Sequence, residues 1–406
     1  MRQIVCISTS NYYPVPTRKQ NVMNRLRDAE ILYIDPPVSL LAPLKDRSAL
    51  KRLTAFRRPG QKAKENITVY SPPPVFPFFN KYRWINRINQ KRLARYIRKR
   101  MREHGFKEPY LWCYSPTSCD LIHLIPNKGV IYDCVDRHSA YKGMIDPAVV
   151  DAMEKDLASA AGQVFCTAAG LYDTLREYNE NTELIPNGVD YELFSRAAAA
   201  SPDASGAASE GLASERAVSP QEGSIGQKEI AGAPKPVFGF VGMLQECIDY
   251  ECMKAVAEAF PEGELILVGR SLPGVDLSSL QAYPNIRFMG LVPQTQLPEI
   301  IAGFDVCLNL FREGRLSKDV SPLKFYEYLA TGKPIVSTRE PLQVLDYADV
   351  VYIAENREDF VVKCREALQE RDPSKAEKRM EYGRACSWDR RVQQMEQTLM
   401  SRGIFE

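Results

Sequence analysis

Residues Phe304–Thr338, FDVCLNLFREGRLSKDVSPLKFYEYLATGKPIVST, contain the signals that decide the fold. The apolar run near their start is short enough for a strand buried on both faces. Ser321 is expected to cap a helix, and Pro322 suits the first helical position, where its missing N–H costs nothing. Gly332 ends this helix, and 335–337 is the next buried strand. A strand, a helix and a further strand in this order predict a parallel α/β sheet.

The same residues place charged groups where nucleotides bind. In open α/β sheets, ligands bind beyond the carboxyl ends of the strands. A helix N-terminus at that place offers free N–H groups and a partial positive charge to phosphate. Asp319, Ser321, Lys324 and Glu327 surround the predicted helix start. We therefore expect a nucleotide phosphate site there.

This stretch resembles the donor-binding segment of retaining glycosyltransferases of the GT-B fold, family 4 and its relatives. Those enzymes carry two acids separated by seven residues, the second followed by a small helix and a Gly-x-Pro turn. Asp319 and Glu327 hold these places here, and 327–334 reads EYLATGKP. The first acid is Asp where the family usually has Glu, and the Gly-Phe-Gly-type residues that flank it in the family are absent. The SPLKFYEYLATGKPIVS version is similar to a branch that includes teichuronic acid biosynthesis glycosyltransferases.

The resemblance implies two Rossmann-like, doubly wound parallel-sheet domains that face each other across a cleft. It also implies transfer of a hexosyl or related sugar from a nucleoside diphosphate donor, expected to be a UDP-sugar, with retention. The acceptor would be a saccharide or a lipid-linked saccharide in cell-envelope polysaccharide synthesis. No metal and no cofactor are expected, because the helix dipole and basic side chains can neutralise the leaving diphosphate.

Residue chemistry and the resemblance together select the donor-binding residues. Lys324 would supply a cation beside the phosphates, and Glu327 would accept hydrogen bonds from ribose hydroxyls. A glycine directly after a strand lets backbone approach the diphosphate. Asp319 would face the sugar hydroxyls. The predicted donor-binding residues are Gly242, Arg270, Lys318, Ser321, Lys324 and Glu327.

A second conspicuous segment, VIYDCVDRHSAYKG at 130–143, follows the cleft-facing end of a predicted strand. Asp136 and His138 are candidates to contact the transferred sugar or the acceptor hydroxyl, and with Asp319 they form the predicted catalytic group. An N-cap or turn role remains open for them, because Asp and Ser favour both. Arg18, Gln20 and Asp133 are the predicted acceptor-binding residues. The Gly-rich loop of many family 4 enzymes is absent from the Arg18 segment.

The length and composition agree with a two-domain globular protein. The chain has 406 residues, an apolar share of 45% and a net charge of +2, and two domains are the prior at this length. We expect an acceptor-binding domain over 1–190, a disordered insertion over 191–234 rich in Ala, Ser, Gly and Glu, a donor-binding domain over 235–385, and a helix over 386–406 that returns to the first domain.

Alternating strand and helix signals fill both halves. Strands are expected at 4–8, 31–35, 110–114, 130–133, 163–166, 237–241, 265–269, 286–289 and 350–353, besides the two in the opening stretch. Helices are expected at 81–104, 147–161, 168–178, 250–260, 296–302, 357–371 and 375–400, the last broken near 386–388.

Several features set the expected compartment. No apolar run of about 18 residues exists, so no transmembrane helix is expected, and the N-terminus is too short in its apolar part for a signal peptide. Ten cysteines lie scattered without paired spacing, which favours reduced thiols in a cytoplasm. Only three histidines occur, which argues against a His-rich metal site.

The positive charge is concentrated in the first half. Residues 45–64 carry eight Lys and Arg against one acid, and 81–107 carry eleven against Glu103. Nucleic-acid binding is disfavoured because no recognised motif accompanies the charge. Peripheral contact with an anionic membrane at the inner face of the plasma membrane is one interpretation. The other is a helix over 81–104 that turns its apolar stripe to the core and its basic side to solvent.

Two other functions stay open from sequence. A nucleotide-sugar epimerase shares this architecture but needs no acceptor, so an assay with donor alone would separate it from a transferase. A non-catalytic nucleotide-sugar-binding scaffold is the other alternative, because the first acid is changed and the Gly-rich loop is missing. The absence of a G-x-G-x-x-G after an early strand argues against a dehydrogenase.

Overall fold

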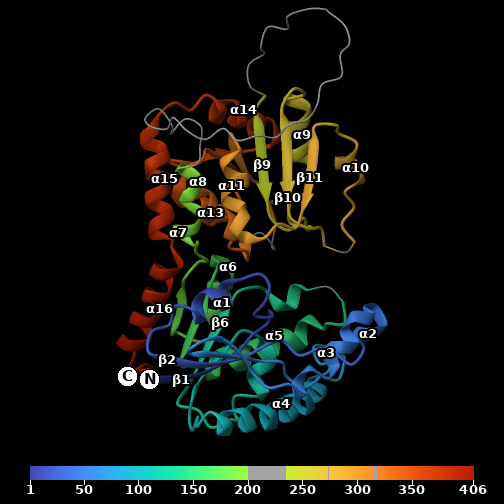
Figure 1. Cartoon of the computed structure of the whole chain (residues 1–406), viewed down its shortest axis with the longest axis vertical. Helices are drawn as coiled ribbons and strands as arrows, with labels where there is room; N and C mark the ends of the chain where they lie inside the picture. The colour runs from blue at the N-terminus through green and yellow to red at the C-terminus, as the bar shows by residue number, and fades with distance from the viewer. Residues whose placement is uncertain (142, 200–234, 273, 315–317) are drawn as a thin grey trace, which may run out of the picture.

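The computed structural model describes residues 1–141, 143–199, 235–272, 274–314 and 318–406. Two α/β domains lie one above the other, with the two chain ends together at the far end of the first domain (Figure 1). The first domain has an eight-stranded sheet and the second a six-stranded sheet. The expected fold of two Rossmann-like domains is confirmed.

The sheet of the first domain has the order β3-β4-β2-β1-β5-β6-β7-β8. Every adjacent pair is parallel except β3 and β4. The strands are β1 (Arg2–Ile7), β2 (Ala29–Ile34), β3 (Gln61–Lys64), β4 (Ile67–Tyr70), β5 (Tyr110–Cys113), β6 (Gly129–Cys134), β7 (Gln163–Cys166) and β8 (Thr182–Leu184).

The sheet of the second domain has the order β11-β10-β9-β12-β13-β14 and is parallel throughout. This is the strand order 3-2-1-4-5-6 of a doubly wound fold, which reverses between β9 and β12. The strands are β9 (Val237–Val241), β10 (Glu264–Val268), β11 (Ile286–Gly290), β12 (Val306–Asn309), β13 (Ile335–Thr338) and β14 (Tyr352–Ala354).

Helices cover both faces of each sheet, because the central strands are apolar on both sides. In the first domain, α4 (Arg83–Glu103), α5 (Pro147–Ala160) and α6 (Ala169–Arg176) pack on one face. In the second domain, α9 (Tyr250–Ala259) and α14 (Arg357–Leu368) pack on one face, and α11 (Leu297–Ala302) and α13 (Leu323–Thr331) on the other. The short helices α2 (Ala42–Lys45) and α3 (Leu50–Leu53) lie beside the first domain.

The last helices join the two domains. α15 (Pro373–Ala385) packs against α13 in the second domain. α16 (Trp388–Ser401) then covers the remaining face of the first sheet together with α1 (Arg18–Met23), through Trp388, Val392, Met395 and Leu399. Figure 1 shows α15 beside the second domain and α16 continuing beside the first, both along one side of the molecule. The return of the chain end therefore completes the core of the first domain.

Some predicted boundaries are wrong. Pro322, and not Ser321, is the N-cap of α13, and no side-chain hydrogen bond caps the helix. The last strand begins two residues later than expected, at Tyr352. The insertion expected from residue 191 is wrong for 191–199, which form α7 (Tyr191–Phe194) and α8 (Arg196–Ala199) against α11 and α13. The other residues of the insertion lie outside the described part of the chain.

The apolar stripe expected on the basic helix is split in the structure. Ile85 and Ile97 of α4 are buried, whereas the side chains of Trp84 and Ile88 are 62% and 42% exposed. Among the described residues, no helix combines the length and the apolar character that a membrane crossing requires. All ten cysteines are unpaired and buried, as reduced thiols should be.

Candidate active site in the interdomain cleft

A cavity of about 330 Å³ lies between the two domains. Its walls include the loops after β1, β6, β9 and β12, at the carboxyl ends of both sheets. The strand order reverses between β1 and β5 in the first sheet and between β9 and β12 in the second. These are the places where α/β sheets bind ligands. Polar residues in the walls are Thr17, Arg18, Lys19, Asp136, Asn187, Gln245, Asn309, Ser321 and Lys324.

The N-terminus of α13 points into this cavity. Ser321, Pro322, Leu323 and Lys324 form part of the wall, so the first turn of the helix directs its N–H groups there. The helix ends at Gly332, which has the left-handed φ of 73° expected for its position. Gly242, which directly follows β9, also lines the cavity. The cavity therefore joins a helix N-terminus to a glycine loop, which suits a phosphate group.

Lys324 and Glu327 form an ion pair one turn apart on α13. Lys324 Nζ lies 2.8 Å from Glu327 Oε2, and Gln294 Nε2 donates to Glu327 Oε1 over 3.3 Å. Glu327 is 3% exposed, and burial raises the pKa of its carboxyl while Lys324 acts against that rise. Lys324 lines the cavity and Glu327 lies behind it, so Glu327 orients the lysine.

The first domain contributes a buried ion pair at the floor of the cavity. Arg18 Nε donates to both carboxylate oxygens of Asp133, over 2.9 and 3.1 Å. Arg18 Nη1 donates to the carbonyls of Ile185 and Pro186. Arg18 Nη2 is buried and has no hydrogen-bond partner among the described residues. Asp133 therefore fixes an arginine that keeps one donor unsatisfied at the cavity.

Lys19 is a cavity residue that sequence reasoning did not single out. Its side chain is 6% exposed, and its Nζ lies 5.7 Å from the centre of the Tyr114 ring. Burial lowers the pKa of its ammonium, and the carboxylates of Asp136 and Asp133 oppose that decrease. In the sequence, Lys19 is one of several basic residues after β1, and no pattern distinguishes it from the others.

His138 lies near Asp136 but does not line the cavity. Its Nε2 is 3.1 Å from the carbonyl oxygen of Tyr114. Burial lowers the pKa of His138 to about 4, so the ring is neutral at pH 7. A neutral ring must place its proton on Nε2 to donate to this carbonyl, which leaves Nδ1 as an acceptor.

Asp319 joins the two domains. Arg137, from the loop after β6, donates to both carboxylate oxygens of Asp319 through Nε and Nη2. The two side chains are only 8% and 4% exposed. The hydrogen bond to Asp319 raises the pKa of Arg137. A second bond crosses the domains nearby, where Asn187 Nδ2 donates to the Ser321 carbonyl over 2.7 Å.

Three predicted site residues lie elsewhere. Gln20 accepts from the Thr17 backbone N–H over 2.8 Å and donates to the Asn11 carbonyl over 2.6 Å, so it shapes the loop before α1. Arg270 is exposed after β10 and does not line the cavity. Lys318 lines a separate hollow with Thr338. Their assigned roles stay predictions.

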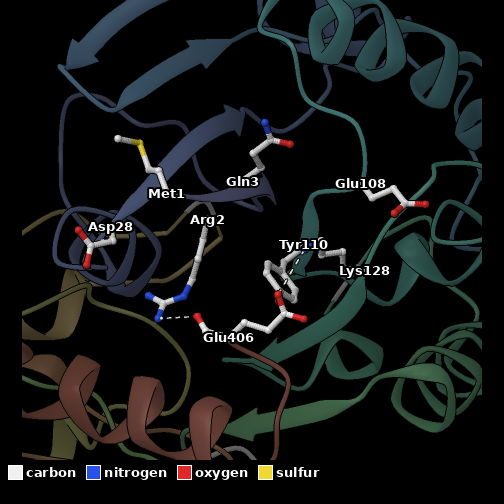
Figure 2. Close-up of a pocket in the computed structure, with 8 residues that line it drawn as sticks. All are labelled: Met1, Arg2, Gln3, Asp28, Glu108, Tyr110, Lys128 and Glu406. Atoms are coloured by element: carbon white, nitrogen blue, oxygen red, sulfur yellow. Dashed lines mark hydrogen bonds and ion pairs between the residues drawn. The ribbon is translucent and has the colours of Figure 1, made fainter.

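A different hollow, of about 470 Å³, lies at the opposite end of the first domain (Figure 2). It surrounds the two chain ends at the amino edge of the sheet, where Arg2 Nη2 donates to the Glu406 carbonyl over 3.3 Å. Lys128 lies 3.7 Å from a Glu406 carboxylate oxygen. The amino edge of a parallel sheet is not where these folds bind ligands, so the cleft remains the candidate site.

Comparison with known proteins supports the expected enzyme class. Residues 235–370 match the family model for glycosyl transferases group 1. A Bacillus subtilis (strain 168) protein, described as "Putative teichuronic acid biosynthesis glycosyltransferase TuaH", is 26% identical over 296 residues, which cover 69% of this chain and 68% of that protein. The predicted resemblance is confirmed, and the residues that the family model matches make up most of the second domain.

Solved structures show the fold of the whole chain. Sucrose-phosphate synthase from Thermosynechococcus elongatus has a TM-score of 0.66 at 14% identity, covering 100% of this chain and 99% of that one. Anabaena Alr3699/HepE, in a complex with UDP and glucose, has a TM-score of 0.62 at 13% identity, covering 99% and 100%. Identities this low show the GT-B fold alone.

Proposed function

We propose that this protein transfers a sugar from a nucleoside diphosphate donor, a UDP-sugar, to a saccharide or lipid-linked acceptor, with retention of configuration, in cell-envelope polysaccharide synthesis. The observation that carries the proposal is the α13 N-terminus with Lys324 and Glu327, which lies inside the matched residues 235–370 and opens into the cleft. The HepE complex with UDP and the teichuronic acid relative support the choice of donor and process.

The cleft chemistry suits a diphosphate leaving group. Lys324 and the N-terminus of α13 offer positive charge from the second domain, and Lys19 offers it from the first. Negative charge that develops on the diphosphate is stabilised by such fixed groups in a partly dry site. The transferred sugar would lie toward Arg18 and Asp136. We expect these positive groups to neutralise the diphosphate without a metal ion.

Nucleotide binding tests this proposal directly. We expect UDP to bind the full chain more tightly than GDP, TDP or ADP in calorimetric titrations, because one base should fit the loops of the second domain. Retained binding in the presence of a chelator would agree with a metal-independent site. Absence of binding by all four nucleotides would contradict the proposal.

We also propose peripheral contact with anionic lipid at the cytoplasmic face of the membrane, through the basic segments 45–64 and 81–107. The solvent side of α4 combines exposed Trp84 and Ile88 with exposed cations. The two basic segments are in contact, because Arg100 Nη2 of the second donates to the carbonyl oxygen of Phe56 in the first over 3.4 Å. A surface of this composition binds an anionic membrane through both the attraction of its charges and the burial of its apolar side chains.

Vesicle sedimentation measures that contact. Removing two exposed cations, Arg95→Ala with Lys99→Ala, should weaken binding to vesicles with one-third phosphatidylglycerol by roughly 2 kcal/mol, about 30-fold, at about 1 kcal/mol per cation. The double change Arg365→Ala with Arg371→Ala, on exposed cations of the second domain, is the control and should leave binding unchanged. Equal weakening by both pairs, or binding that ignores salt, would contradict the assignment.

A further inference from the structure

A hollow of about 280 Å³ lies in the first domain, at the carboxyl ends of three neighbouring strands. Asn11 follows β1, Asp35 follows β2 and Ser71 follows β4, and all three line it. The adjacency of these strands, in the order β4-β2-β1, brings their following residues to one place. This edge is where α/β domains bind ligands, and the cleft cavity described above lies at the same edge.

The loop after β1 separates this hollow from the cleft cavity. Asn11 and Tyr13 line the hollow, while Thr17, Arg18 and Lys19 line the cleft cavity. The residues that line the two spaces on this side are therefore neighbours along one loop. A saccharide chain that occupies the hollow can present its next sugar toward the donor site.

The residues of the hollow suit a saccharide that carries an acidic group. Arg52 and Arg58, from the basic segment, line it together with Asp35. Asp35 Oδ1 accepts a hydrogen bond from the Tyr12 N–H over 2.9 Å. Burial raises the pKa of Asp35 to about 6, so at pH 7 its carboxyl is mostly ionised and accepts hydrogen bonds from hydroxyl groups. Tyr13 lines the hollow and is 48% exposed, so its ring is accessible to a sugar.

Few contacts within the protein hold the side chains of Arg52 and Arg58. Arg52 Nη2 donates to Asn11 Oδ1 over 3.3 Å, and Arg58 has no ion pair among the residues that the structure describes. Guanidinium groups recognise carboxylates and phosphates through paired N–H donors. Two such groups in one hollow, beside an acceptor of hydroxyl hydrogen bonds, fit a sugar that carries an acid.

We propose that this hollow is the acceptor subsite, and that it takes a saccharide bearing an anionic group, a carboxylate or a phosphate, bound by Arg52 and Arg58 with its hydroxyls on Asp35. The inference rests on the proposed glycosyltransferase function, since it names the acceptor class for that site. It also gives part of the basic segment a local task that differs from general attraction to a membrane.

The test is binding of matched saccharides to the full chain saturated with UDP, by saturation-transfer NMR with calorimetry. The probes are a glucuronic-acid-terminated disaccharide, its glucose-terminated counterpart and glucose 6-phosphate. We expect at least one acidic probe to bind at least about tenfold more tightly than the neutral disaccharide, since hydrogen bonds to charged groups carry this much. Which acidic probe binds identifies carboxylate or phosphate as the group recognised.

Neighbouring cations supply matched controls. Arg52→Ala and Arg58→Ala should each weaken the acidic probe by about tenfold or more, whereas Lys51→Ala and Arg57→Ala, which remove equal charge outside the hollow, should not. Equal weakening by all four, or equal affinity for the neutral disaccharide, would overturn the subsite. Loss of all saccharide binding while UDP still binds overturns only this inference, whereas failure of UDP itself overturns the proposed function as well.

Discussion

Replacing Glu327 by alanine is expected to weaken UDP binding by about 1–3 kcal/mol, roughly 5- to 150-fold, the range for losing a partner of a charged hydrogen-bonding group. The expectation follows from the position of this side chain. Glu327 is buried behind Lys324, with the two charged atoms 2.8 Å apart, so alanine leaves the cavity lysine without its orienting partner. Calorimetric titration of UDP into both proteins gives the difference directly.

Uridine separates two roles for Glu327. If its carboxylate accepts bonds from the ribose, Glu327→Ala should weaken uridine and UDP to a similar extent. If it acts through Lys324 on the phosphates, only UDP should lose affinity, and Lys324→Ala should show the same pattern. The contacts in the structure favour the second outcome, because Lys324 and not Glu327 lines the cavity.

An exposed pair of the same spacing is the control. Lys363 and Glu366 on α14 lie 3.0 Å apart, also three residues from each other, but at the surface. Glu366→Ala should leave UDP affinity unchanged, since exposed pairs contribute little. Unchanged UDP affinity in Glu327→Ala, with the fold intact, would remove this residue from the donor site.

Local signals predicted α13 well, and long-range contacts explain what they missed. Gly332 marks the helix end because glycine readily adopts the left-handed backbone conformation found there, and this preference can be recognised from the residue alone. The helix start was displaced by one residue because Ser321 accepts a hydrogen bond from Asn187 N–H over 3.1 Å instead of capping. That partner is far away in the sequence and belongs to the other domain, so no local pattern could show it.

The candidate site shows the same division. Sequence placed Arg18, Asp136, Gly242, Ser321 and Lys324 at a site, and all of them line the cleft cavity. It could not show that Lys19 would be buried, since burial comes from packing between loops. The short strands β4 and β8 were missed because three or four residues are too few to show the alternation that identifies a strand.

The Asp319 assignment depends most on tertiary structure, and its test has the largest expected effect on stability. Sequence placed this acid against the sugar, whereas the structure pairs it with Arg137 across the domains. Removing one member of a buried ion pair costs about 3–5 kcal/mol, because the other charge stays buried and unpaired. We therefore expect Asp319→Ala to lower the free energy of unfolding by about that amount in urea titrations.

A double-mutant cycle decides whether the pair or the sugar explains Asp319. Because Arg137→Gln with Asp319→Asn removes both charges and keeps an amide pair, the double variant should regain much of the stability that either single variant loses. Glu355→Ala, which breaks the exposed pair with Arg339, should cost at most about 1 kcal/mol. If instead Asp319→Asn abolishes turnover at unchanged stability, and Arg137→Gln leaves both intact, then Asp319 acts on the sugar and the ion pair is incidental. The structure predicts the first pattern, since the two buried charges of Arg137 and Asp319 stabilise the contact between the domains only when both are present.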